Sequence, residues 1–200
     1  MNNTFFIADT HFGDESIIIF ENRPFSTSKE MDHAIIHNWN SNVKKEDCVF
    51  ILGDYSFYDF QGTKTITQKL NGYKILVLGN HDMGLEIDCW KDAGIDEVYK
   101  YPIIFNKYFI LSHEPIYMSK NMPYINVHGH LHHLTYNDTG FFNVCLENIN
   151  YTPINAETVY QKYKSDTHTE INKESGIKSQ EGKQKNIKIF TVRKTGTTKR

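Results

Sequence analysis

Five short groups of aspartate, asparagine and histidine residues occur between residues 9 and 132. Carboxylate and imidazole side chains together suit borderline divalent ions such as Mn²⁺, Fe²⁺ or Zn²⁺, and none of the groups contains a thiolate that would select strongly for zinc. The sequence therefore indicates a metal site assembled from separate segments. The groups are Asp9-Thr10-His11, Gly53-Asp54, Gly79-Asn80-His81-Asp82, His113 and Gly129-His130-Leu131-His132.

Each group alone has an ordinary structural explanation. A single Asp-x-His is more often a hydrogen-bonded pair than a metal site, a Gly-Asp after a strand can be a turn, and a lone histidine usually belongs to the core or the surface. Only His130 and His132, which follow a glycine at alternate positions, suggest a metal site by themselves. Five such coincidences in one chain are a poor explanation, because each group follows an apolar segment.

Three apolar segments in the first half of the chain are predicted to be buried strands, and each ends at one of the groups. If the first strand continues through its group, Asp9 and His11 lie on the same face of it. Ligands in α/β folds gather beyond the carboxyl ends of the strands, which is where these groups fall. The predicted strands are Asn3–Ala8, Cys48–Leu52 and Tyr73–Leu78.

Helices are expected between and after these strands. Apolar residues at helical spacing predict a helix over residues 29–42 with Ser28 as its N-cap, and a shorter one that ends at Asn71. In the second half, residues 103–105 and 108–112 read as a hairpin that leads to His113. Further strands are expected at residues 124–127 and 141–146, and a last helix at residues 156–163.

Composition separates a folded body from a basic tail. With 39% hydrophobic and 14% aromatic residues, the 200-residue chain suits one folded domain. Residues 165–200 hold nine Lys/Arg and four Asp/Glu, whereas residues 1–164 hold thirteen and twenty, respectively. We therefore expect a domain over residues 1–164 and a flexible C-terminal tail over residues 165–200. The acidic body argues against a long nucleic acid as the main partner.

The cellular location of the protein and the state of its cysteines are inferred from features that the sequence does not contain. It has no apolar stretch long enough to span a membrane and no signal peptide, so a cytoplasmic location is expected. Its three cysteines are scattered and odd in number, and they are interpreted as small buried residues rather than as disulfide partners or ligands.

The ordered groups resemble the signature of the calcineurin-like metallophosphoesterase superfamily, which runs Asp-x-His, Gly-Asp, Gly-Asn-His-Asp/Glu, His and Gly-His-x-His. The resemblance covers roughly residues 3–150. Within the superfamily the chain is similar to short bacterial and phage-type predicted phosphoesterases, which tend to carry Asn-Arg-Pro-Phe as at residues 22–25. Those proteins often have histidine where this chain has Asp14, a departure that we expect to affect substrate contacts rather than metals.

The resemblance implies an α/β fold, a four-layer αββα sandwich with two divalent metal ions at the sheet edge, of which Mn²⁺ is favoured and Fe²⁺ and Zn²⁺ are alternatives. Asp54 would bridge the two ions, and a shared hydroxide would be the nucleophile. The implied ligands are Asp9, His11 and His132 for one ion and Asn80, His113 and His130 for the other.

Other residues are assigned roles next to the metals. In the family pattern His81 faces the phosphate and helps the leaving oxygen to depart, and Asp82 is expected to orient its ring. Arg23 is a candidate phosphate ligand, although the adjacent Pro24 also suits a structural turn. His128 is interpreted as a core histidine. The aromatic residues after Asp54, namely Tyr55, Phe57 and Tyr58, either line the pocket or simply pack.

The expected function is metal-dependent hydrolysis of a small phosphate ester such as a nucleotide, with phosphodiesterase and phosphomonoesterase activity both open. The alternative is a catalytically silent metal-binding scaffold of the same fold. Such proteins typically lose metal ligands or the histidine equivalent to His81, and this chain has all of them. The oligomeric state and the role of the tail are not indicated by the sequence.

Overall fold

Two β-sheets and their helices make up the part of the chain that carries the motifs. The computed structural model describes residues 2–119, 122–136 and 138–167. The chain divides into two compact units, Met1–Tyr160 and Gln161–Arg200. The first unit contains both sheets, and of the second unit only residues 161–167 are described, all of them helical. The predicted tail over residues 165–200 therefore falls almost entirely outside the described residues.

The first sheet contains the three apolar strands that the sequence predicted. β1 (Thr4–Ile7), β2 (Cys48–Ile51) and β3 (Tyr73–Val77) are parallel neighbours. β4 (Glu97–Tyr99) pairs in parallel with β3, and β9 (Ile154–Asn155) pairs antiparallel with β1. Because β1 to β3 are parallel and in step, their carboxyl ends meet at one edge of the sheet.

The second sheet has the order β5-β6-β7-β8. β5 (Ile103–Phe105) and β6 (Phe109–Ser112) form the predicted antiparallel hairpin, whereas β7 (Ile125–His128) and β8 (Phe141–Asn143) add to it in parallel. Ser112 lies opposite His128, so β6 and β7 end together. Residues 113 and 129–132 therefore emerge side by side.

Four helices and two 3₁₀ turns connect the strands of the described residues: α1 (Glu15–Phe20), α2 (Ser28–Asn42), α3 (Phe60–Thr67), α4 (Ile87–Asp92), η1 (Asp82–Gly84) and η2 (Leu146–Asn148). The N-cap of α2 is Thr27, whose hydroxyl accepts from the Glu30 amide at 3.2 Å, so the predicted cap at Ser28 was wrong by one residue. A further helical run begins at residue 156 and reaches residue 160 within the first unit. None of the described helices combines the length and the apolar character that a membrane span needs.

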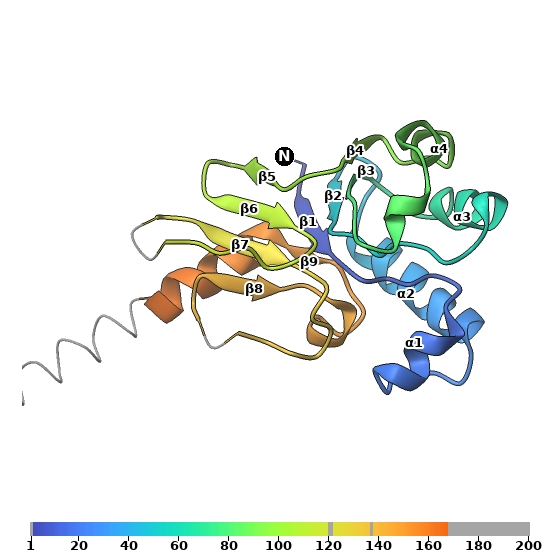
Figure 1. The fold of residues 1–200 in the computed structure, drawn as a ribbon, viewed down its shortest axis with the longest axis horizontal. Helices are drawn as coiled ribbons and strands as arrows, with labels where there is room; N and C mark the ends of the chain where they lie inside the picture. The colour runs from blue at the N-terminus through green and yellow to red at the C-terminus, as the bar shows by residue number, and fades with distance from the viewer. Residues whose placement is uncertain (1, 120–121, 137, 168–200) are drawn as a thin grey trace, which may run out of the picture. The chain divides into compact units, whose positions relative to one another are not determined.

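The two sheets pack face to face through an aromatic cluster centred on Phe6 of β1. The Phe6 ring lies 5.2 Å from that of Phe109 and 6.5 Å from that of Phe105, both in the second sheet. Figure 1 shows α2, α3 and α4 beside the first sheet. Tyr160 of the last helical run stacks on Tyr108 at the start of β6, at 4.6 Å. The predicted αββα arrangement of two sheets with helices is confirmed.

We predict that Phe6→Ala destabilises the protein by about 3–5 kcal/mol, because the Phe6 side chain is fully buried and its loss leaves a cavity between the sheets. The measurement is the free energy of unfolding in urea. Phe20→Ala is the matched control, since Phe20 is 78% exposed and its removal should change stability by less than about 0.5 kcal/mol. Equal effects of the two changes would contradict the assigned core.

Candidate metal centre

The residues expected to bind metal leave their strands in an uncommon backbone conformation. Asp9, His11, Asp54, His130 and His132 all have positive φ, at 55°, 49°, 51°, 66° and 47°. Residues other than glycine rarely adopt this left-handed region, although Asp, Asn and His do so more often than others, and such residues cluster at functional sites. The strand β1 ends at Ile7 and does not continue through Asp9 and His11, so the condition for placing both side chains by strand alternation is not met. Tight turns, rather than strand alternation, direct both side chains to one place.

Two motif glycines are required because ligand side chains touch their backbone. A Cβ on Gly79 would collide with Oδ1 of Asp54, and a Cβ on Gly129 would collide with Oδ2 of Asp9. Any side chain at either position would displace a carboxylate. The glycines of the motifs are thus part of the geometry of the site.

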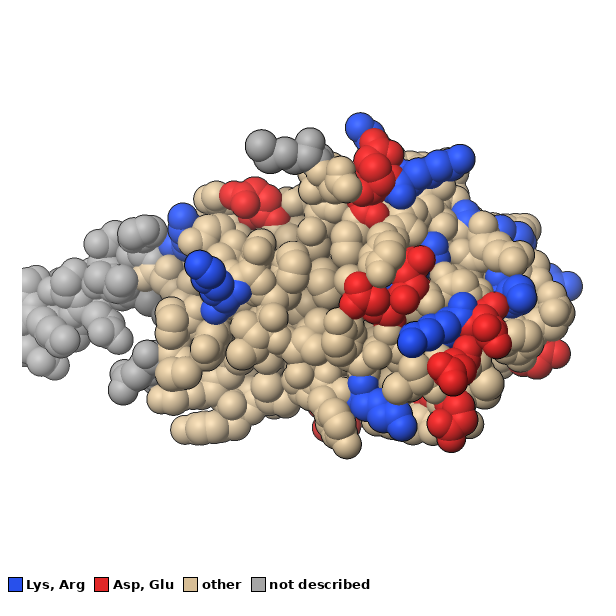
Figure 2. Space-filling model, turned by 90° about the horizontal axis from the view of Figure 1, so that it is seen from above, with Lys and Arg blue, Asp and Glu red and all other residues tan. Residues whose placement is uncertain are grey.

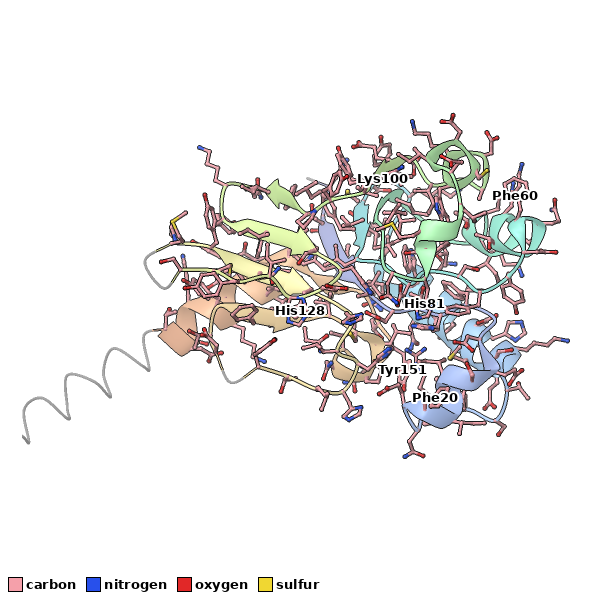
Figure 3. The ribbon with its side chains drawn as sticks, viewed as in Figure 1. Phe20, Phe60, His81, Lys100, His128 and Tyr151 are labelled. Carbon is pink, nitrogen blue, oxygen red and sulfur yellow. The ribbon has the colours of Figure 1, made fainter. Side chains whose placement is uncertain are left out.

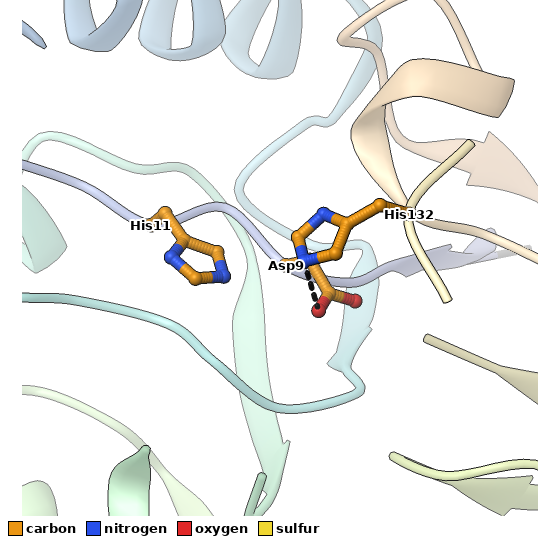
Figure 4. Close-up of side chains that lie close together, drawn as sticks. All are labelled: Asp9, His11 and His132. Atoms are coloured by element: carbon orange, nitrogen blue, oxygen red, sulfur yellow. Dashed lines mark ion pairs between the residues drawn. The ribbon is translucent and has the colours of Figure 1, made fainter. Parts of the chain in front are cut away.

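The first set of candidate ligands, here called cluster A, consists of Asp9, His11 and His132. One ligand atom from each lies within 4.8 Å of the others, and Nε2 of His132 lies 3.9 Å from Oδ1 of Asp9 (Figure 4). Oδ1 of Asp9 and Nε2 of His11 are buried and have no hydrogen-bond partner. Buried polar atoms are nearly always paired, so these two atoms point to a cation between them.

The second set, here called cluster B, consists of Asp54, His113 and His130, whose ligand atoms also lie within 4.8 Å of one another, together with Asn80. Nδ1 of His113 donates to the Leu52 carbonyl at 2.9 Å, so its Nε2 presents a lone pair. That lone pair faces the carbonyl oxygen of Asn80 at 2.9 Å. Nδ1 of His130 lies 3.1 Å from both of these atoms, so three candidate ligand atoms converge on one place.

Asp54 connects the clusters. Its Oδ2 lies 3.8 Å from Nε2 of His11 in cluster A and 3.4 Å from Nε2 of His113 in cluster B. A single carboxylate oxygen between two sets of ligands has the position of a bridge. Its other oxygen, Oδ1, accepts a hydrogen bond from the His81 amide at 3.0 Å.

The electrostatics of Asp9 and His11 suit a bound cation. Burial raises the pKa of Asp9, and burial followed by the charge of Arg23 lowers the pKa of His11 to about 4. His11 is consequently neutral near pH 7, which is the form that binds metals. A buried carboxylate whose ionised form is disfavoured and a neutral imidazole with a free nitrogen both gain from a divalent ion.

His81 is placed at the open side of the site. Both Asn80 and His81 are exposed, whereas Asp9, His11, Asp54 and His113 are buried. The His81 ring lies 5.9 Å from the His11 ring and 5.1 Å from the Phe57 ring, and Figure 3 shows it near the strand ends. His81 is therefore accessible to a ligand from solvent.

Asp82 does not orient His81 in the predicted way. Its Oδ2 accepts from the amides of Asp54 at 2.7 Å and Gly79 at 2.9 Å. Its Oδ1 accepts from the amide of Tyr55 at 3.1 Å. Backbone amides thus occupy both oxygens of the buried carboxylate. Asp82 instead holds the turns after β2 and β3 together.

The proposed phosphate contact of Arg23 does not match its placement. The Arg23 side chain is fully buried, and it donates to the Asp9 carbonyl at 2.8 Å and the Thr10 carbonyl at 3.3 Å. Its Nε and Nη2 both contact Oε1 of Glu147 at 2.8 Å. With these partners Arg23 cannot reach a substrate, and it supports the Asp9–His11 turn from behind. The structural alternative for this residue is the correct one.

Three residues close to cluster A had no metal-related role in the sequence interpretation. Glu147 accepts from Nδ1 of His132 at 3.4 Å, and Asp14 accepts from Nδ1 of His11 at 3.1 Å. The thiol of Cys145 donates to Oδ2 of Asp9 at 3.1 Å. Glu147 could have been noticed as the one charged residue within residues 141–149. Asp14 was expected to affect substrate contacts rather than metals, but it contacts the candidate ligand His11 instead. Cys145 carries no comparable signal.

The structure also places His128 and the three aromatic residues that follow Asp54. His128 is fully buried in β7, as expected of a core histidine. Tyr55 is buried and bonded to Thr67, and Tyr58 donates to Asp32 at 2.7 Å. Phe57 alone of the three aromatic residues is exposed, at 44%, and it stacks on the His11 ring at 4.8 Å.

Comparisons with known proteins agree with this geometry. The family model described as calcineurin-like phosphoesterase matches residues 3–191. An uncharacterized protein of Methanocaldococcus jannaschii is 33% identical over 172 residues, which cover 80% of this chain and 90% of that protein. The gene 66 protein of Mycobacterium phage L5 is 35% identical over 85 residues, 41% of each chain. The crystal structure of a protein of unknown function from Aquifex aeolicus aligns with a TM-score of 0.64 and 26% identity, over 80% of this chain and 99% of that one.

We predict that Arg23→Met lowers the free energy of unfolding by about 3–5 kcal/mol, because it leaves the Glu147 carboxylate buried without its cation. Urea denaturation gives this quantity, and Lys29→Met, a change at an exposed position, is the control. A substrate-binding role would show the opposite pattern: unchanged stability with a raised KM.

Proposed function

The chain belongs to the calcineurin-like phosphoesterase family, a family of metal-dependent phosphoester hydrolases, and on this premise we propose that it hydrolyses small phosphate esters at a dinuclear metal centre. The observation that carries the proposal is the position of Asp54 Oδ2, between the nitrogen atoms of His11 and His113. One carboxylate oxygen facing both clusters suits two ions that act together.

The residues of both clusters would hold the ions. Cluster A supplies a carboxylate and two imidazoles, and cluster B supplies two imidazoles and the Asn80 amide oxygen, with Asp54 shared. When bound, the two ions would lower the pKa of a shared water towards about 7 and offset charge on the phosphoryl oxygens. The mixed nitrogen and oxygen ligands suit Mn²⁺, Fe²⁺ and Zn²⁺, and among these we propose Mn²⁺ from the resemblance to the family.

His81 would assist the leaving group. Its backbone amide donates to the proposed bridging carboxylate, which places the residue beside the metals while its side chain remains exposed. From there it can donate a proton, or a hydrogen bond, to the leaving oxygen of the ester. Asp82 contributes indirectly, because it fixes the turn that carries His81.

The mixed charges on one face of the molecule favour a small substrate over a long nucleic acid. On the face drawn in Figure 2, Lys and Arg side chains are interspersed with Asp and Glu side chains, and no continuous basic stripe crosses the described residues of that face. A long nucleic acid would need such a stripe. Phe57, exposed next to His11 and His81, offers an apolar surface to the organic part of a nucleotide or aryl ester.

A catalytically silent scaffold is the competing function. The chain retains every ligand of both clusters as well as His81, and the described geometry brings them together. A scaffold that only binds metal would not need His81, an exposed side chain beside the clusters that can donate a proton. The enzyme is therefore the better supported of the two functions.

We predict that Asp54→Asn abolishes hydrolysis, because a neutral amide cannot bridge two cations. The measurement is a panel of nucleotide monoesters, diesters and cyclic esters with added Mn²⁺, together with the number of bound metal ions per chain. The panel also separates monoesterase from diesterase activity. Wild-type rates in Asp54→Asn would exclude the dinuclear mechanism.

We predict that His81→Asn keeps both metal ions but lowers kcat by about 10²–10⁴-fold, as expected for loss of a proton donor. His37→Asn is the control, since His37 is an exposed residue of α2 away from the clusters. Unchanged turnover in His81→Asn would remove this residue from the mechanism. Bound metal without hydrolysis in the wild type, across all esters and metals tested, would favour the scaffold.

A further inference from the structure

The two histidines of cluster A each have a carboxylate on the nitrogen that faces away from the metal position. Nδ1 of His11 donates to Oδ2 of Asp14 at 3.1 Å, and Nδ1 of His132 donates to Oε1 of Glu147 at 3.4 Å. Both acceptors belong to largely buried side chains, at 9% and 8% exposure. These are the residues that the sequence interpretation did not connect with the metals.

The histidines of cluster B lack such partners. The outer nitrogen of His113 donates to a neutral carbonyl, that of Leu52. His130 turns its Nδ1 inward, 3.1 Å from Oδ1 of Asn80. Among the described residues, no acidic side chain hydrogen-bonds to the outer nitrogen of either ring. The two clusters therefore differ in what lies behind their imidazoles.

This difference has a chemical consequence. A carboxylate behind a metal-binding imidazole fixes its tautomer and ring orientation and makes the inner nitrogen a stronger donor, and loss of such a partner typically costs about 10–100-fold in metal affinity. In cluster A the inner nitrogen of His11 is buried and unpartnered, as is Oδ1 of Asp9. The ligand atoms of cluster A are thus held in position before any ion arrives.

We propose that Asp14 and Glu147 are positioning residues for His11 and His132, and that they make cluster A the tighter of the two metal positions. This inference rests on the proposed dinuclear site and goes beyond it, because it assigns unequal affinities and the residues that cause them.

Asp14 allows a clean test because its two oxygens have separate tasks. Oδ1 caps α1 by accepting from the Ser16 amide at 2.8 Å, while Oδ2 holds His11. Serine is also a good N-cap but is too short to reach the His11 ring. Asp14→Ser should therefore keep the helix and release the imidazole. Glu147 is less suitable, since its removal would leave Arg23 buried without a counter-ion.

The experiment is titration of the metal-free, full-length protein with Mn²⁺, followed by calorimetry and by electron paramagnetic resonance. We expect wild-type protein to bind two ions in distinct steps. Asp14→Ser should weaken the first step by about 10–100-fold and leave the second within about threefold. In a separate NMR measurement on the metal-free protein, it should shift the ¹⁵N resonances of the His11 ring. Asn80→Ala should remove the second step only, because Asn80 belongs to cluster B.

Asp59→Ser is the matched control. Asp59 caps α3 through the Gly62 amide at 2.8 Å, so the same exchange is made at a helix N-cap that has no histidine to hold. Both Mn²⁺ steps should be unchanged in this variant. Asp14→Asn is the second variant: its one carboxamide oxygen cannot both cap α1 and accept from His11, so the first step should weaken here too.

Three outcomes would overturn the inference. Two equal Mn²⁺ steps in the wild type, with hydrolysis intact, would refute it and leave the proposed function standing. Equal weakening of both steps by Asp14→Ser, or of neither, would refute the role of Asp14. No Mn²⁺ binding by wild-type protein would refute the proposed function itself, and this inference with it.

Discussion

The hydrogen bonds that the Asp82 carboxylate accepts from three backbone amides tie together the ends of β2 and β3, and the site depends on them. They fix the turn that presents Asp54 and, through the next residues, the turn that presents Asn80 and His81. Gly79 must lack a side chain because Asp54 passes directly against it. Burial raises the pKa of Asp82, and the amide hydrogen bonds act in the opposite direction. The amide hydrogen bonds of the turns thus offset the unfavourable free energy of burying the Asp82 carboxylate.

Arg23 and Glu147 perform the corresponding task on the other side of the site. Arg23 binds the carbonyl groups of Asp9 and Thr10, and its ion pair with Glu147 connects this turn to η2. Burial alone would raise the pKa of Glu147, but its hydrogen bond with His132 and the charge of Arg23 lower that pKa to about 2. Glu147 therefore stays ionised, and one carboxylate serves both the Arg23 support and the His132 ligand.

The sequence predicted the strands and the ligands better than the support around them. The runs of apolar residues before Asp9, Asp54 and Asn80 identify buried strands without knowledge of the fold, because a sheet covered on both faces needs them. The helix α1 was missed because its sequence, ESIIIF, has no apolar period of three or four residues. The helix α4 and the strand β4 were missed because they are too short for a periodic pattern of apolar residues to be recognised.

Roles that depend on tertiary contacts could not be predicted in the same way. Arg23 resembled a phosphate ligand by its residue type alone, and only its burial against Glu147, 124 positions away, shows that it is a support. Asp82 was next to His81 in the chain and was assigned to it for that reason, yet its partners are the amides of Asp54, Tyr55 and Gly79. The types and order of residues in the sequence identify the candidate ligands. The residues that support those ligands are identified only by where their side chains point in the folded structure.

The conformation of the ligand residues explains why so much support is needed. Five of them have left-handed backbones, at a cost of order 1–3 kcal/mol each. Two buried atoms, Oδ1 of Asp9 and Nε2 of His11, have no partner within the described residues, which adds about 1–3 kcal/mol each. Divalent ions would pair these atoms. The fold therefore bears the cost of arranging the ligands, so that an arriving ion finds them already in place.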